Sequence, residues 1–242
     1  MNLNIRYILA HGWFTGLAAI KSSYYYIIAN LCLPLSLLFV VGVLSHGELL
    51  PYALAGGLVS MMVTNSIQSA GELTQFRLDD RHQDLIIATK TGPLDYMFGE
   101  MLGSFEWSIP SILLYLALDM SYHLLTPYNL VMTMAVCILV TVATLSLVFS
   151  ILSFVKYTRK SWAISMMLST LLTVIAPTFY PYTYIPKSVL FVLAILPSTP
   201  AAVLEQGLFG LAPISWYMLI ILIAETFVYL FVARYIARWR ES

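Results

Sequence analysis

The chain has 242 residues, of which 60% are hydrophobic and only 10% are charged, and its formal net charge is zero. Soluble globular domains carry about one quarter charged residues, so this composition excludes them and indicates an integral membrane protein. A neutral chain also lacks the basic surface that nucleic-acid binding requires. Because each membrane-crossing helix needs about 20 apolar residues, we expect about six spans in a single transmembrane domain, residues 1–242.

The first twenty residues predict a helix that lies at the membrane surface. Leu3, Tyr7 and Trp13 stand among polar neighbours, and aromatic side chains of this kind collect at the level of the lipid headgroups. The segment lacks a separate hydrophobic stretch followed by a cleavage site. We therefore interpret residues 1–20 as an uncleaved, interfacial amphipathic helix.

Long apolar segments follow and predict an all-α polytopic membrane protein with six transmembrane helices. The first contains Pro34, which predicts a kink whose free carbonyl is satisfied by a bundle neighbour or a nearby serine. The second is rich in small residues that let another helix approach closely. The predicted spans cover residues of about 23–44, 51–70, 96–118, 130–154, 161–178 and 214–233.

Residues 71–95 form the most charged stretch between two of these apolar segments. Arg77, Asp80, Arg81 and Asp84 recur there at spacings of three and four, so they can pair along one side of a short helix. Leucine and isoleucine residues supply an apolar side. Such a helix lies in water between two spans, where a soluble partner can bind it.

The region from residue 177 to residue 213 is interrupted by six prolines. The apolar pieces between them are too short to cross a membrane, so we expect a re-entrant or interfacial hairpin there.

Basic residues set the orientation of the whole chain. Eleven of the twelve lie in the ends and connections of one side, and only Lys187 lies opposite, which predicts that both termini are cytoplasmic.

Two acidic residues inside predicted spans are candidates for a substrate path. Glu106 and Glu225 are costly in hydrocarbon, so each either lines a path or relays protons, or forms a hydrogen bond across helices. Methionine side chains adapt to varied ligands, although in a helix they more often serve simple packing. The methionine candidates for the path are Met61, Met62, Met166 and Met167.

Several kinds of chemistry have no motif in the sequence. It contains no phosphate-binding G-x-x-x-x-G-K-[ST] loop, no G-x-S-x-G nucleophile motif and no H-E-x-x-H metal pair, so we expect neither catalysis nor a bound metal or cofactor in this chain. Asp79, Asp80 and Asp84 resemble the aspartate-rich loops of membrane prenyltransferases, which hold Mg²⁺. The second aspartate cluster that such enzymes need is missing.

Together these features resemble the membrane subunit of an ABC-2-type transporter, over nearly the whole chain. The amphipathic start is similar to the connecting helix of that family, and residues 71–95 resemble its coupling helix between spans 2 and 3. Within them, residues 77–94, RLDDRHQDLIIATKTGPL, are similar to the charged stretch of the family that leads into an apolar run and a proline turn before span 3. Phe179-Tyr180-Pro181 and Ile185-Pro186 resemble the extracellular re-entrant region. The chain departs from the family pattern at Ile185, where leucine is usual, and at Leu196, where asparagine is usual.

The resemblance implies a mechanism and partners. Two permease subunits, either identical or sister chains, would pair in the cell membrane with two copies of a separate ATPase. The ATPase copies would bind ATP and Mg²⁺ and drive the permease subunits between inward- and outward-facing states. Arg77, Asp80, Arg81 and Asp84 would then contact or orient the ATPase. An amphipathic or lipid-linked substrate would be exported at the subunit interface, between spans 2 and 5.

Two other classes of protein remain as alternatives. A stand-alone secondary transporter or channel would need grouped intramembrane charges, helices broken at the midplane or an inverted repeat, and no repeat relates residues 1–120 to residues 121–242. The aspartate-rich prenyltransferase is the other. The dependence on an ATPase distinguishes the permease from both, while the identity of the substrate lies beyond the sequence.

Overall fold

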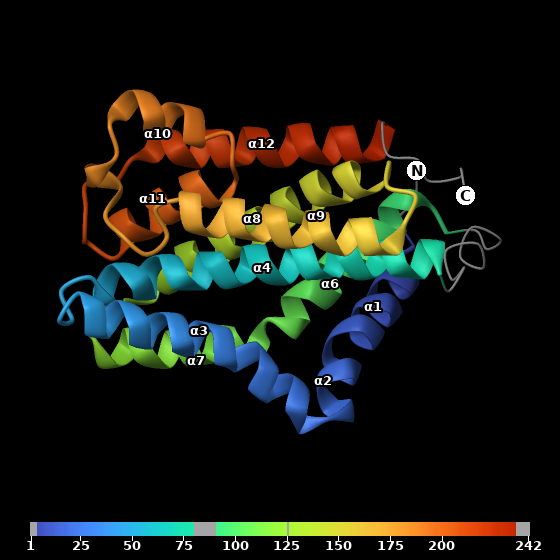
Figure 1. Cartoon of the computed structure of the whole chain (residues 1–242), viewed down its shortest axis with the longest axis horizontal. Coiled ribbons are helices and arrows are strands. Elements are labelled where there is room, and N and C mark those ends of the chain that lie inside the picture. Colours follow the sequence, from blue (N-terminus) through green and yellow to red (C-terminus); the bar gives the residue numbers. More distant parts are fainter. Residues whose placement is uncertain (1–3, 80–90, 125, 236–242) are drawn as a thin grey trace.

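The computed structural model describes residues 4–79, 91–124 and 126–235, and every regular element in those ranges is a helix. The long helices run along the longest axis of the molecule (Figure 1). At one end, α1 (Ile5–Trp13) and α2 (Ala19–Ser22) lie obliquely to that axis. The all-α architecture predicted from the sequence is confirmed for the described residues.

Four helices of the described residues are long and apolar enough to cross a membrane, and a bent pair of helices gives a fifth candidate span. The four are α3 (Tyr24–Leu44), α4 (Leu50–Leu78), α8 (Pro127–Leu152) and α12 (Trp216–Tyr235). The bent pair consists of α6 (Pro93–Trp107) and α7 (Ile109–Ser121). Five of the six predicted spans therefore have a counterpart among these helices.

The third predicted span, residues 96–118, is broken where a continuous helix was expected. Its two halves meet at Ser108 with a bend of 47°. Pro110 lacks the backbone N–H that a continuous helix needs here, and sharp kinks usually occur at proline. Polar side chains from two other helices support the break: Asn65 donates to the Ser108 hydroxyl (2.8 Å), and Asn30 donates to the last carbonyl of α6 (3.3 Å).

Helix α3 passes through Pro34 without ending. A proline inside a helix leaves the carbonyl four residues earlier without its backbone donor, and that carbonyl belongs to Asn30. The hydroxyl of Ser111 in α7 donates to it at 3.3 Å. A serine of a neighbouring helix thus satisfies the carbonyl, as the sequence predicted.

The fifth predicted span corresponds to α9 (Thr158–Thr170), which continues directly into a π-helical turn, η2 (Leu171–Ile175). The chain then becomes extended at Ala176. This extended segment packs so closely on α4 that a Cβ atom added at Gly56 would lie 1.9 Å from the carbonyl oxygen of Thr178. Glycine at position 56 is what permits this approach.

The proline-rich region folds into short helices that are tied together by one amide side chain. The helices are η3 (Tyr182–Tyr184), α10 (Lys187–Leu193) and α11 (Ser198–Leu208). Gln206 in the buried helix α11 donates to the carbonyl of Pro177 (2.7 Å) and accepts from the backbone N–H of Tyr182 (3.0 Å). Gln206 thereby satisfies a carbonyl and an N–H of the backbone that form no hydrogen bond within a helix.

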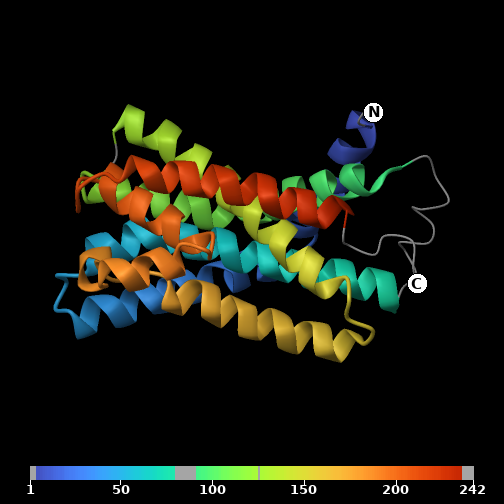
Figure 2. The same cartoon turned by 90° about the horizontal axis from the view of Figure 1, so that it is seen from above.

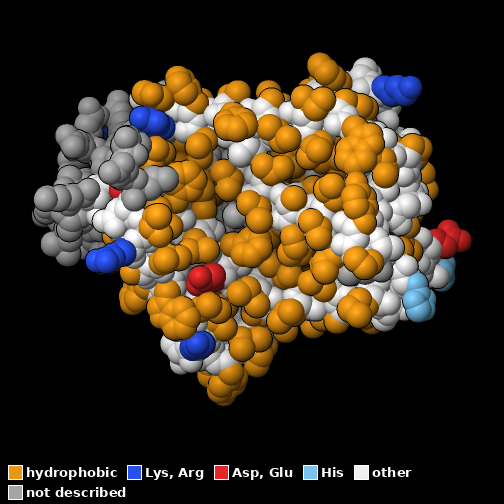
Figure 3. All heavy atoms as spheres, turned by 180° about the vertical axis from the view of Figure 1, so that it is seen from behind, with side chains coloured by type: hydrophobic (Ala, Val, Ile, Leu, Met, Phe, Trp, Pro, Cys, Tyr) orange, Lys and Arg blue, Asp and Glu red, His pale blue; other side chains and the backbone are white. Residues whose placement is uncertain are grey.

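Helix α4 lies in the middle of the bundle (Figures 1 and 2). In the most apolar part of α4, 83% of the residues are buried, whereas the corresponding values are 17% for α3 and 22% for α12. The outer helices therefore present apolar side chains outward, and Figure 3 shows such side chains over most of one face. A surface of this kind fits lipid rather than water.

Candidate functional site

The predicted coupling segment, residues 71–95, begins as the last two turns of α4, which ends at Leu78. Asp80, Arg81 and Asp84 lie outside the described residues. The structure therefore describes the two ends of the segment, residues 71–79 and 91–95, and both are held by hydrogen bonds to other parts of the chain.

Arg77 attaches the first end of the coupling segment to the end of α8. Its guanidinium group donates to the carbonyls of Leu152 (3.0 Å), Ser153 (3.0 Å) and Val155 (2.8 Å). The last carbonyls of a helix have no partner within the helix and carry partial negative charge, so a guanidinium group suits them. Arg77 thus links α4 to the turn between α8 and α9.

Two carboxylates complete these attachments. Asp79 accepts a hydrogen bond from the hydroxyl of Thr158, the first residue of α9, at 2.8 Å. At the other end of the segment, Asp95 accepts from the backbone N–H of Gly92 (2.9 Å) and from that of Asn4 (2.9 Å). The two described ends of residues 71–95 are therefore attached to the α8–α9 turn and to the start of α1.

Helix α1 and the π-helical turn that follows it, η1 (Phe14–Ala18), pack closely on α6 through glycines on both sides. A Cβ atom at Gly12 would lie 2.7 Å from the side chain of Leu102, and one at Gly103 would lie 1.9 Å from the hydroxyl of Thr15. Small residues let helix backbones approach at such distances. Helix α1 and η1 are therefore packed tightly against α6, the first half of the bent pair.

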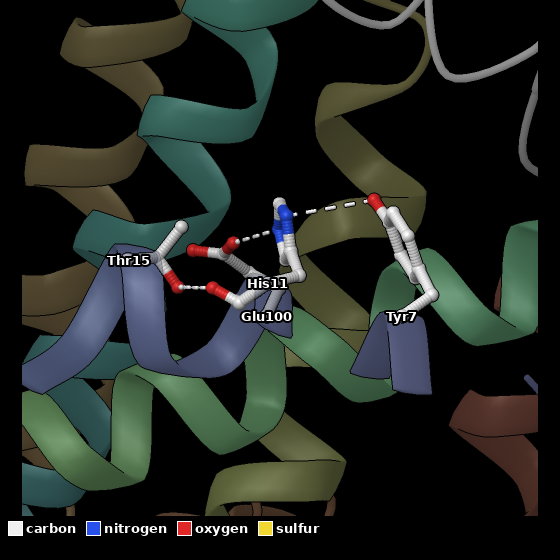
Figure 4. Close-up of polar contacts among 4 residues, drawn as sticks. All are labelled: Tyr7, His11, Thr15 and Glu100. Carbon is white, nitrogen blue, oxygen red and sulfur yellow. Dashed lines mark hydrogen bonds and ion pairs between the residues drawn. The ribbon is translucent and has the colours of Figure 1, made fainter. Parts of the chain in front are cut away.

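A buried polar cluster joins the same two helices (Figure 4). Nε2 of His11 lies 3.0 Å from Oε2 of Glu100, and Nδ1 of His11 lies 3.4 Å from the Tyr7 hydroxyl. Burial, and then the charge of Glu100, raise the pKa of Tyr7, so its hydroxyl stays protonated. A carboxylate such as that of Glu100 accepts hydrogen bonds and does not donate them. Nε2 then carries the proton that is donated to Glu100. Sequence analysis did not pair these residues, which are 89 positions apart.

Replacement of His11 with leucine should release α1 from α6. The substitution leaves the buried Glu100 carboxylate without its donor, which costs about 3–5 kcal/mol for a buried pair. Glu100→Gln is the matched control, because its amide oxygen still accepts from Nε2. Hydrogen exchange of residues 5–22, measured by mass spectrometry, should rise in His11→Leu and stay near the wild-type rate in Glu100→Gln. Equal protection in all three proteins would contradict this role of the pair.

The predicted path residues occupy different environments. Glu106 accepts a hydrogen bond from the backbone N–H of Leu17 in η1 at 3.2 Å, and Glu225 lies in an apolar groove of about 640 Å³ between α10 and α12. The four predicted methionines also differ in their surroundings. Those of α4 are buried in the core, and those of α9 are exposed on the surface. The buried pair is Met61 and Met62, and the exposed pair is Met166 and Met167.

Two buried acids were missed by sequence reasoning. Asp119 is fully buried in α7, and its carboxylate oxygens have no hydrogen-bond partner among the described residues. Glu205 is fully buried in α11 and accepts from the hydroxyl of Thr133 at 2.8 Å. The sequence signal that could have predicted the burial of Glu205 is its position within an apolar run of the proline-rich region.

A polar cavity of about 340 Å³ lies at the end of the bundle that carries the interfacial helix. One face of α4 supplies its polar side, and η1, α3, α6 and α9 supply the rest. Among the residues that the structure describes, no group of three histidine, cysteine or acidic side chains is arranged to hold a metal ion.

Comparison with protein families gives one match. The family described as ABC-2 type transporter matches residues 8–204, which is more than half of the chain. No curated protein and no solved structure matches the chain. The matched range contains most of α1, residues 71–79 and 91–95, and the first four of the candidate spans. The chain therefore belongs to the ABC-2 type transporter family and is a multi-pass membrane permease of that family.

Proposed function

We propose that this chain is the membrane subunit of an ATP-driven exporter whose ATPase is a separate protein. The observation that carries the proposal is the attachment of the coupling segment at both ends. Arg77 and Asp79 hold the α8–α9 turn, and Asp95 holds the start of α1. Movement of an ATPase bound to residues 71–95 would thus move three parts of the permease together.

The distribution of charge supports a cytoplasmic location for the ATPase-binding end. In Figure 3 the described Lys and Arg side chains lie mainly toward one end of the molecule. The same end carries α1 and the last turn of α12 (Figure 1). Since basic residues favour the cytoplasmic side, both termini and the coupling segment would face the cytoplasm of a cell membrane.

A six-span topology follows if α9 and η2 form one span. They are helical without a break from residue 158 to residue 175, which is close to the minimum length for crossing a membrane. The α10–α11 hairpin would enter the membrane from outside. In support, the Tyr229 hydroxyl, more than halfway along α12, donates to the carbonyl of Ile195 in the hairpin turn at 2.6 Å.

Transport would proceed by alternating access in a pair of such subunits, either identical or sister chains. Two ATPase copies would bind ATP and Mg²⁺, and this ATP-driven step would close the pair of ATPases on each other. The coupling segments would pass the closing motion to the membrane spans. An amphipathic or lipid-linked substrate would cross between the subunits. The single transmembrane domain proposed here includes the whole chain, residues 1–242.

Affinity purification of the tagged protein from its native membranes, followed by mass spectrometry, tests the proposal. A soluble protein with a phosphate-binding loop should be recovered in stoichiometric amount. Charge reversal at Arg81 or Asp84 should remove that protein or uncouple its ATP hydrolysis from transport, because both lie in the predicted contact. Lys187→Glu, which reverses a charge at the opposite end, should change neither.

One result would favour the alternative class. If the chain were recovered alone and carried ion flux in liposomes without ATP, it would be a stand-alone transporter or channel. Normal transport by both the Arg81 and the Asp84 variants would instead show that residues 71–95 are not the coupling segment.

A further inference from the structure

The polar cavity of about 340 Å³ contains a row of polar side chains from helix α4. Gln68, Ser69, Glu72 and Gln75 recur at spacings of one, three and three, so they share one helix face directed into the cavity. None of their side chains forms a hydrogen bond or ion pair with another described residue. Gln68 and Glu72 are exposed, Gln75 is half-buried and Ser69 is buried, so this face is open to water or a ligand.

Aromatic side chains enclose the cavity on its other sides. Tyr26 comes from α3, Trp107 from the break between α6 and α7, and Trp162 from α9. The rings of Tyr26 and Trp107 already contact each other edge to face, with centroids 5.4 Å apart. Three separate elements thus bring aromatic rings to one cavity.

The cavity combines one acidic side chain with aromatic rings. Of the described residues that line it, Glu72 is the only charged one, and no lysine or arginine is among them. Aromatic faces carry negative potential and attract cations, most strongly when water is excluded. A carboxylate and several aromatic rings therefore act in the same direction, toward a positively charged ligand.

We propose that this cavity binds an organic cation with a single ammonium group, either a protonated amine or a quaternary ammonium. The ammonium would lie between Glu72 and the faces of Trp107 and Trp162, and the amides of Gln68 and Gln75 would bind polar groups of the same molecule. This inference rests on the proposed function, because it names the chemical class of the transported substrate.

Other ligand classes fit the lining less well. A phosphate or carboxylate would meet Glu72 with no compensating cation among the described lining residues. A neutral sugar would use the amides and the rings but would leave the carboxylate charge uncompensated in a partly enclosed site. A purely apolar molecule would leave the whole polar face of α4 unpaired.

Equilibrium binding of tritiated benzyltrimethylammonium to the purified full chain in dodecyl maltoside tests the inference. Saturable binding is expected, and unlabelled benzyltrimethylammonium should displace the probe. Neopentylbenzene, its neutral carbon isostere, should not, because it has the same shape without the charge. Displacement by free choline would indicate a soluble ammonium ligand, and displacement by dihexanoylphosphatidylcholine would indicate a lipid headgroup. Both results would support the cation site.

Two variants locate the binding. Glu72→Gln keeps the size and polarity of the side chain and should weaken binding about tenfold or more. Trp162→Leu should weaken it about fivefold through the loss of one aromatic face. Glu48→Gln, which removes an exposed carboxylate outside the cavity, is the control and should bind as wild type. Thermal unfolding of each variant in the same detergent checks that the fold is retained.

Equal displacement by the neutral isostere, or unchanged affinity in a folded Glu72→Gln variant, would overturn the inference. Neither result involves the ATPase. If the ATPase still copurified with the chain, only the cation site would be wrong, whereas loss of that partner would count against the proposed function.

Discussion

Alanine in place of Gly56 is expected to destabilise the native helix bundle strongly. The added Cβ would lie 1.9 Å from the carbonyl oxygen and 2.6 Å from the Cα of Thr178. These are backbone atoms of the segment that follows η2, so no rotamer change relieves the clash. Overpacking of a core costs 1–3 kcal/mol and occasionally more, and a clash with backbone lies at the upper end, about 3 kcal/mol.

The measurement is the fraction of monodisperse protein in mild detergent, together with the midpoint of thermal unfolding. Gly42→Ala in α3 provides the matched control, because its Cβ would meet only one atom, a methyl group of Leu50 at an ordinary 3.8 Å. That control should equal the wild type or exceed it, since alanine favours a helix over glycine. A Gly56→Ala protein as stable as the Gly42→Ala control would show that α4 and residues 176–178 do not pack in this way.

Replacement of Arg77 with methionine is expected to release the turn between α8 and α9 from α4. Hydrogen bonds from a charged donor contribute about 1.5–3 kcal/mol each, and Arg77 makes three of them to the carbonyls of residues 152, 153 and 155. The three are not additive, so we expect a loss of about 3 kcal/mol in total. Hydrogen exchange in residues 153–160 should rise accordingly.

The Arg77 variants also separate binding from coupling. Because the guanidinium group binds carbonyls of its own chain, an ATPase partner should still copurify with the Arg77→Met variant. The rate of ATP hydrolysis in that complex should no longer respond to the permease. Arg77→Lys should be intermediate, since an ammonium cannot reproduce the planar fork of donors. Arg159→Met removes a charge from an exposed residue at the same end and should leave exchange and coupling unchanged. Unaltered exchange in Arg77→Met would contradict the role of this contact.

Much of the helical framework was predictable because membrane spans leave a strong signal. The predicted segments 23–44, 130–154 and 214–233 lie within a few residues of α3, α8 and α12. Long apolar runs must form helices in lipid, since no water is present to satisfy the backbone. Family membership likewise followed from the order of these spans and of the charged stretch between two of them.

Boundaries decided by tertiary contacts were not predictable. The second span was expected to end near residue 70, yet α4 continues to Leu78, where Arg77 meets the carbonyls of α8. The break at Ser108 has a local cause in Pro110, but the side chains that support it, Asn30 and Asn65, lie on other helices. Hydropathy measures only the preference of a segment for lipid, so it does not register a hydrogen-bond partner far along the chain.

The sequence by itself determined that the protein lies in a membrane, how many apolar segments it has, which connections are basic and which stretch is the candidate for coupling. These properties depend on composition and local order. The tertiary structure alone decided that His11 pairs with Glu100, that Asp119 and Glu205 are buried, and that polar side chains of α4 line one cavity together with aromatic rings from three other helices. Each of these depends on side chains brought together from distant positions, and burial and hydrogen bonding exist only once the helices have packed.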